Sequence, residues 1–131
     1  MGEKDPLTEI VIGAAIEVHR LMGPGLLESV DQKCMEEELR LRGCGCKPLA
    51  RVPLEYKGVP LGDDLVMDLY FPGQLVVELK AVEKLLPVHE AQLISYLKLS
   101  KTHVGLLLNF NVPVLVDGLR RRVLGEKPET P

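Results

Sequence analysis

The chain has 131 residues, of which 46% are hydrophobic and 27% are charged, and its formal net charge is −3 at pH 7. This length suits one domain with a single core, and the composition argues against intrinsic disorder. The acidic balance provides no overall attraction to nucleic acid, although it is compatible with a local basic edge beside an acidic metal site.

The N-terminal stretch MGEKDPLTE is acidic and polar, and it lacks the basic-then-apolar order of a signal peptide. No apolar run approaches the roughly 20 residues that a membrane-spanning helix needs. We therefore expect a cytoplasmic protein without a membrane partner. Residues 1–131 are expected to form a single domain, with a flexible tail over residues 125–131.

Two helices are predicted in the first third of the chain. Residues 7–22 carry apolar side chains at helical spacing, and Gly23-Pro24-Gly25 interrupts that pattern. A second helix is expected from about Leu26 to Arg42. Its inward-facing residues are predicted to be Leu27, Val30, Cys34 and Leu41.

Three cysteines, Cys34, Cys44 and Cys46, are an odd number, and Cys44-Gly45-Cys46 is too tight for easy pairing with itself. A zinc site would need a fourth ligand, and the sequence contains neither a second Cys pair nor a His-x-x-x-His. We expect reduced thiols without a functional role.

The middle of the chain changes to strand patterns. Residues 51–56 alternate apolar and polar side chains and end at a Lys57-Gly58 turn. Two further strands, residues 65–70 and 74–79, flank a turn at Pro72-Gly73. Together they predict a hairpin.

The last third adds a helix and two strands. Pro87 is predicted to open a helix that runs to about Leu99. Residues 102–110 form an apolar run bounded by polar residues, which is typical of a strand covered on both faces. A short edge strand is expected near residues 118–124. The whole order predicts one α/β domain with a mixed β-sheet flanked by helices.

The predicted hairpin gathers three charged residues. A turn centred on Gly73 places Asp68 opposite Glu78, with Cβ atoms about 5 Å apart. Lys80 follows Glu78 by two residues and projects from the same face. Two close carboxylates repel each other unless a cation intervenes, and Mg²⁺ prefers oxygen ligands. The pattern indicates either a metal site or a charged cluster on a solvated sheet face.

These residues resemble a known signature. Asp68, a hairpin and then Glu78-Leu79-Lys80 resemble the PD-(D/E)XK nuclease superfamily, in which an acid on one strand precedes acid-x-lysine on the next. The segment from Gln92 to Tyr96 is similar to the QxxxY element of RecB-type nucleases. The stretch GPGLLESVDQ resembles the motif of the GxxExxY family, a group of small prokaryotic proteins in that superfamily. The resemblance implies a restriction-endonuclease-like core.

The resemblance also implies roles for single residues. Asp68 and Glu78 would bind Mg²⁺, with Mn²⁺ as a substitute, and the backbone carbonyl of Leu79 would add a ligand. Lys80 would assist the attacking water. Glu28 matches the Glu of GxxExxY, so it would complete the metal shell or position a water. Its alternative role is a favourable charge at a helix N-terminus.

Three positions keep alternatives open. Gln92 and Tyr96 share a helical face, where the amide and the phenol would bind a phosphate or a base; the alternative is packing between helices. Asp31 stands where the GxxExxY motif has Tyr. It either adds a carboxylate or marks the loss of a contact that activity needs.

The leading interpretation is a metal-dependent nuclease that hydrolyses phosphodiester bonds of nucleic acid, with DNA favoured over RNA as the substrate. The alternative is a catalytically inactive nuclease-fold binding module in a protein or nucleic-acid assembly, which the acidic balance and Asp31 favour. A homodimer or a partner protein is compatible with both. The single basic run, residues 120–122, either contacts a phosphate backbone or forms a solvated strand edge.

Overall fold

Five strands form one mixed sheet in the computed structural model, which describes residues 5–125. The strands lie side by side in chain order, and only β3 and β4 run parallel. The predicted α/β fold with a mixed sheet is confirmed. Except for Gly125, the predicted flexible tail lies outside the described residues. The strands are β1 (Lys47–Tyr56), β2 (Val59–Phe71), β3 (Leu75–Lys80), β4 (Val104–Asn109) and β5 (Leu119–Val123).

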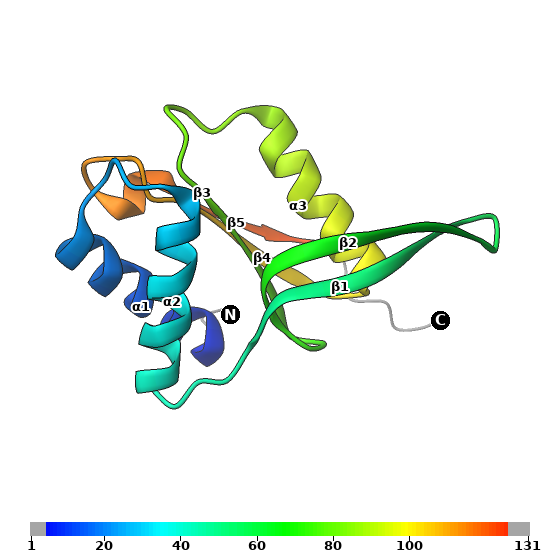
Figure 1. Cartoon of the computed structure of the whole chain (residues 1–131), viewed down its shortest axis with the longest axis horizontal. Coiled ribbons are helices and arrows are strands. Elements are labelled where there is room, and N and C mark those ends of the chain that lie inside the picture. Colours follow the sequence, from blue (N-terminus) through cyan, green and yellow to red (C-terminus); the bar gives the residue numbers. More distant parts are fainter. Residues whose placement is uncertain (1–4, 126–131) are drawn as a thin grey trace.

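Helices cover both faces of the sheet (Figure 1). The helices α1 (Pro6–Met22) and α2 (Glu28–Leu41) pack on one face, and α3 (Pro87–Ser100) packs on the other as the crossover between the parallel strands β3 and β4. A short 3-10 helix, η1 (Leu115–Gly118), precedes β5. Within residues 5–125 no helix is both long enough and apolar enough to cross a membrane.

Two hydrophobic clusters hold these layers together. We call the cluster beneath α1 and α2 the first cluster and the one beneath α3 the second cluster. Leu106 and Leu108 of β4 belong to the first, whereas Leu107 between them belongs to the second. The prediction that this strand is covered on both faces is therefore confirmed. Cys34, Cys44 and Cys46 are free thiols, half-buried at the edge of the first cluster.

The absence of a side chain at Gly105 lets α3 lie close to β4. A Cβ atom at this position would lie 2.8 Å from Leu93 Cδ1 and 3.1 Å from Leu97 Cδ2. Both leucines are fully buried in the second cluster. The close packing of α3 on the sheet therefore depends on Gly105 in β4.

The hairpin of β1 and β2 is longer than the sequence pattern predicts. The strands begin at Lys47 and Val59 and meet at a two-residue turn, Lys57-Gly58, whose φ angles of 51° and 81° are both positive. Such a turn matches the twist of the flanking strands, so pairing continues up to it. Figure 1 shows the two strands projecting past α3. We call residues 52–66 the arm.

The strand β2 bends sharply at Asp68. Met67 packs in the second cluster, yet Leu69, two residues on, packs in the first. In a regular strand these two side chains would share a face. On the neighbouring strand, Leu49 has a positive φ of 52° at the corresponding level. The bend therefore involves both strands and has Asp68 at its centre.

The predicted inward face of the second helix is wrong at Leu27 and Leu41, whereas Cys34 packs against the first cluster as predicted. Leu27 and Leu41 are 73% and 63% exposed. The helix begins at Glu28, and Leu27 precedes it in an extended conformation. Its inner face buries two polar side chains, which apolar periodicity does not reveal. The buried residues of α2 are Asp31, Gln32, Met35 and Leu39.

Candidate active site

The acidic residues Asp68 and Glu78 contact each other where the β2–β3 ladder ends. The ladder pairs Leu69 with Val77, which is the register that the sequence predicts. One step further, the Asp68 backbone N–H donates to Glu78 Oε2 at 3.0 Å, and the Leu79 N–H donates to Asp68 Oδ2 at 2.7 Å. Because β2 bends at this point, the two carboxylates accept backbone N–H groups from the opposing strand.

Burial makes this pair of carboxyl groups unusual. Glu78 is only 4% exposed, and burial, followed by the negative charge of Asp68, raises its pKa to about 9. Burial also raises the pKa of Asp68, while the Leu79 N–H and the Lys80 charge act in the opposite direction. Two desolvated carboxylates in contact do not both ionise easily without a cation.

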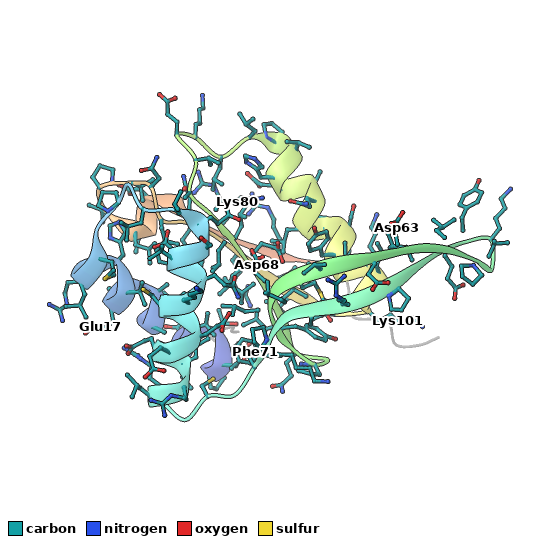
Figure 2. All side chains as sticks on the ribbon, viewed as in Figure 1. Glu17, Asp63, Asp68, Phe71, Lys80 and Lys101 are labelled. Atoms are coloured by element: carbon teal, nitrogen blue, oxygen red, sulfur yellow. The ribbon has the colours of Figure 1, made fainter. Side chains whose placement is uncertain are left out.

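Lys80 brings positive charge to this pair. Its ammonium lowers the pKa of both carboxyl groups, although less than burial raises them. Its side chain is half-buried. Lys80 follows Glu78 by two residues on β3 and so projects from the same face of the sheet, and Figure 2 shows Asp68 and Lys80 in the region between α2 and α3.

The helix α3 turns Gln92 and Tyr96 toward the carboxylates. The Gln92 amide donates to Tyr96 Oη at 2.9 Å. Burial raises the pKa of the Tyr96 phenol, and the charges of Glu78 and Asp68 raise it further. Gln92 also borders a shallow hollow on the outer side of α3, together with Val88, His89, Ala91 and Ser95. The side chains of Asp68 and Glu78 do not line that hollow. Gln92 lines it and also contacts Tyr96, which lies near the two carboxylates.

His89 has a structural role at the start of α3. Its Nδ1 accepts the Leu86 backbone N–H at 2.9 Å. This contact satisfies one of the backbone donors that a helix leaves unpaired at its N-terminus. His89 is therefore a cap of this helix.

Glu28 lies apart from the acidic pair. It is exposed at the first residue of α2. Within residues 5–125, no three side chains of His, Cys, Asp or Glu are arranged to hold a metal ion. The structure thus brings together Asp68, Glu78 and Lys80, and it does not add Glu28.

The sequence interpretation missed Gln32, which ties α2 to the site. Its amide nitrogen donates to the Asp68 backbone carbonyl and to Glu36 Oε2, each at 2.8 Å. Gln32 is buried and lies four residues after Glu28, hence on the same helical face. In the sequence, the four-residue spacing between Glu28 and Gln32 was the signal that could have identified Gln32 as a residue near the site.

Asn109 is a second residue that the sequence interpretation missed. Its side chain is 1% exposed and forms hydrogen bonds with both backbone groups of Val82, two residues after Lys80. Asn109 Oδ1 accepts the Val82 N–H at 3.0 Å, and Asn109 Nδ2 donates to the Val82 carbonyl at 2.9 Å. Asn109 therefore fixes the segment that follows Lys80.

Asp31 is buried on α2 but is not part of the acidic pair. It is 1% exposed, and its Oδ1 has no hydrogen-bond partner among the described residues. Burial raises its pKa to about 6, opposed by the charge of His19 and reinforced by that of Glu28. Its electrostatic neighbours are thus on α1 and at the start of α2.

The basic run on β5 is partly engaged within the domain. Arg122 forms a salt bridge with Glu90 of α3, and Arg120 lies 4.0 Å from the same carboxylate. Arg121 is exposed. Two of the three arginines therefore help to attach β5 to α3.

The acidic pair suits a hard divalent ion. Carboxylate oxygens are the ligands that Mg²⁺ prefers, and a positive ion would relieve the conflict between Asp68 and Glu78. Burial first, and the charge of Asp68 second, raise the pKa of Glu78, so both make its ionised form costly without a cation. The residues present therefore fit a metal site with two carboxylates.

A family model described as the PD-(D/E)XK nuclease superfamily matches residues 5–122. This match covers most of the chain and includes both carboxylates, Lys80 and α3. No curated protein and no solved structure matches the chain.

Proposed function

Because the chain belongs to the PD-(D/E)XK nuclease superfamily, we propose that it is a divalent-metal-dependent nuclease that hydrolyses phosphodiester bonds of DNA. The observation that carries this proposal is the contact between Asp68 and the buried Glu78, with Lys80 beside them. An acidic pair that is costly without a cation is expected where a cation is needed for function.

Asp68 and Glu78 are the proposed metal ligands, with Mg²⁺ as the natural ion and Mn²⁺ as a substitute. The backbone carbonyl of Leu79 is the proposed third ligand, and the motif assigns Glu28 as a fourth, although Glu28 lies apart from the acidic pair in this structure. When bound, such an ion would activate water as a nucleophile and neutralise charge on the phosphate. Assignment to the GxxExxY group within the superfamily supports the role of Glu28 and stays a prediction.

The remaining residues position the reactants. Lys80 is held near the carboxylates by opposite charge, so its ammonium can orient the attacking water or stabilise negative charge on a phosphate oxygen. Gln92 and Tyr96 present an amide and a phenol on the facing side of α3. We assign them to contacts with a phosphate or a base of the substrate.

The second candidate function is a binding module that keeps the nuclease fold without catalysis. Two observations favour it: Glu28 lies apart from the acidic pair, and Asp31 occupies the position of the motif Tyr. In such a protein the surface around α3 would bind a partner without cleaving it.

Metal binding can be measured by thermal unfolding. We expect Mg²⁺ or Mn²⁺ at about a hundred times its dissociation constant to stabilise the protein by roughly 2.7 kcal/mol, which raises its Tm by several degrees. Asp68→Asn should abolish this rise. Asp64→Asn is the matched control, because Asp64 is an exposed carboxylate on the same strand. A metal response that persists in Asp68→Asn would place the ion elsewhere.

Cleavage of single- and double-stranded DNA and RNA separates the two candidate functions. We expect cleavage that requires metal and falls about 100-fold or more in Lys80→Met, while the metal-induced rise in Tm remains. Lys84→Met replaces an exposed lysine nearby and should cleave normally. Metal binding without cleavage of any of these substrates would favour the binding module.

A further inference from the structure

The arm has one apolar face, and α3 covers only its inner part. Near the body, Val52 and Leu65 pack against the second cluster beneath α3. Further out, Tyr56 and Val59 pair directly across the two strands and are 63% and 59% exposed. Figure 1 shows this outer part extending beyond every helix.

Strand periodicity places these residues on one face. Val52, Leu54 and Tyr56 alternate along β1 and therefore point to the same side. Val59 lies opposite Tyr56, so it joins them. The exposed fraction rises from half-buried Leu54 to Tyr56 as the strand leaves the cover of α3. The outer face is therefore a continuation of the core that no helix within residues 5–125 covers, where the Tyr56 ring meets the Lys57 ammonium at 5.4 Å from its centroid.

The register of the arm shifts between Pro53 and Glu55. At this shift β2 contains two more residues than β1. The extra residues form a bulge, in which Gly62 adopts a positive φ of 79°. The resulting bulge presents Leu61, which is 53% exposed, and Asp63. The bulge adds another apolar side chain to the exposed part of the arm.

The opposite face of the arm carries charged residues, between which lie Pro53, Pro60 and Val66. Arg51 and Asp64 form a salt bridge there at 3.6 Å, and Glu55 alternates with the apolar residues of β1. Such a division into a charged and an apolar face is typical of a ribbon that packs on one side.

The free edges of the arm are unsuited to strand addition. Pro53 on β1 and Pro60 on β2 have no backbone N–H, and proline on an exposed edge discourages pairing with another strand. A partner is therefore expected to pack on the apolar face.

The charge of the arm argues against nucleic acid as that partner. The acidic side chains outnumber the basic ones, and a phosphate backbone is attracted by an excess of Lys and Arg. The acidic residues of the arm are Glu55, Asp63 and Asp64, and its basic residue is Lys57, with Arg51 just outside the arm.

We propose that the apolar face of the arm is a homodimer interface, in which the arm of a second copy packs against it face to face and antiparallel. A two-fold axis makes the same patch serve both subunits. The antiparallel arrangement brings Lys57, at the tip of one arm, toward the partner's Asp63, nearer the base. The surface is thus complementary to itself in both its apolar residues and its charge.

The size of this surface predicts a weak dimer. The arm spans residues 52–66 and only one of its faces would pack, so it supplies far fewer residues than the roughly 20–30 per side of a standard interface. We therefore expect a dissociation constant of about 1–100 μM. This inference does not depend on nuclease activity, since neither Asp68 nor Glu78 takes part in it.

Sedimentation velocity of the full chain across that concentration range tests the proposal. The wild-type protein should pass from monomer to dimer, and Val59→Glu should remain monomeric with an unchanged Tm. Val116→Glu is the matched control, because Val116 on η1 is a valine exposed to a similar extent, 54%. This control should dimerise as the wild type does. A wild type that stays monomeric throughout, or a dimeric Val59→Glu, would overturn the proposal.

A charge exchange tests the antiparallel arrangement. Lys57→Glu should weaken dimerisation about tenfold, and adding Asp63→Lys should restore it. If the double variant is weaker than either single variant, the arrangement is wrong. If Val59→Glu reduces DNA binding by a monomeric wild type, the arm contacts nucleic acid and the proposal also fails.

Discussion

Asp31 illustrates how one buried carboxyl group can couple stability to pH. Its side chain is almost fully buried, and its Oδ1 lacks a hydrogen-bond partner among the described residues. Burial raises its pKa from 3.8 to about 6. The folded chain therefore holds this proton more tightly than the unfolded chain does. The resulting stabilisation is present below about pH 4 and is lost as the pH rises to about 6.

We predict that Asp31→Asn raises the free energy of unfolding at pH 8 by about 1–3 kcal/mol, because it removes a buried charge. The variant should also lose the decrease in stability between about pH 4 and pH 6. Urea denaturation at several pH values measures both effects. Asp117→Asn, at an exposed position, is the control. A less stable Asp31→Asn protein at pH 8 would mean that the carboxylate has a favourable partner, His19 being the nearest candidate.

The sequence predicts the acidic pair well because its geometry is local. A single tight turn separates Asp68 from Glu78, so the register of the hairpin follows from the position of Gly73. Gln32 and Asn109 could not be found in this way. Gln32 contacts Asp68, 36 residues later in the chain, and Asn109 contacts Val82, 27 residues earlier. Such contacts depend on how whole elements pack.

At the scale of elements, Asn109 links the end of β4 to the segment that follows β3. It satisfies both backbone groups of Val82. Leaving a buried backbone donor or acceptor unpaired costs about 1–3 kcal/mol. The position of Lys80, two residues earlier, is therefore stabilised by a side chain from the neighbouring strand.

We predict that Asn109→Ala lowers the free energy of unfolding by about 2–4 kcal/mol, since both groups of Val82 lose their partner. Hydrogen exchange of the Val82 amide should become faster than in the wild type. Asn111→Ala, at a half-buried neighbouring position, should change either quantity much less. Unchanged exchange at Val82 would show that the side chain of Asn109 does not hold this segment.

Sequence patterns identify the elements more reliably than their faces and ends. The apolar run of β4 was found because every residue of the strand after half-buried Val104 is buried. The face of α2 was misread because Asp31 and Gln32 occupy positions that usually hold aliphatic residues. The length of the arm was underestimated because the exposed ends of β1 and β2 contain prolines and a glycine, which ordinarily interrupt strands.

At the scale of the whole molecule, the site forms between layers, and Gly105 sets their separation. The helix α3 can approach β4 because no side chain stands between that strand and Leu93. The same approach brings Tyr96 near the carboxylates. The distance between the two halves of the site is therefore determined by packing in the second cluster.

We predict that Gly105→Ala lowers the free energy of unfolding by about 1–3 kcal/mol, because α3 must shift to accommodate the added methyl group. DNA cleavage should fall as well, since Gln92 and Tyr96 move with the helix. Gly45→Ala is the control, because a Cβ there meets nothing within 4 Å. Normal stability and cleavage in Gly105→Ala would mean that Leu93 and Leu97 can rearrange at little cost.

The dependence of Asp68 on Gln32 has a consequence for biosynthesis. The acids and Lys80 lie on one short hairpin, yet the groups that surround them come from both the early helix α2 and the later helix α3. A nascent chain that has not yet released α3 and β4 from the ribosome lacks one wall of this site. The full set of groups around the acids and Lys80 is therefore assembled only once β4 has been synthesised and α3 has packed on the sheet.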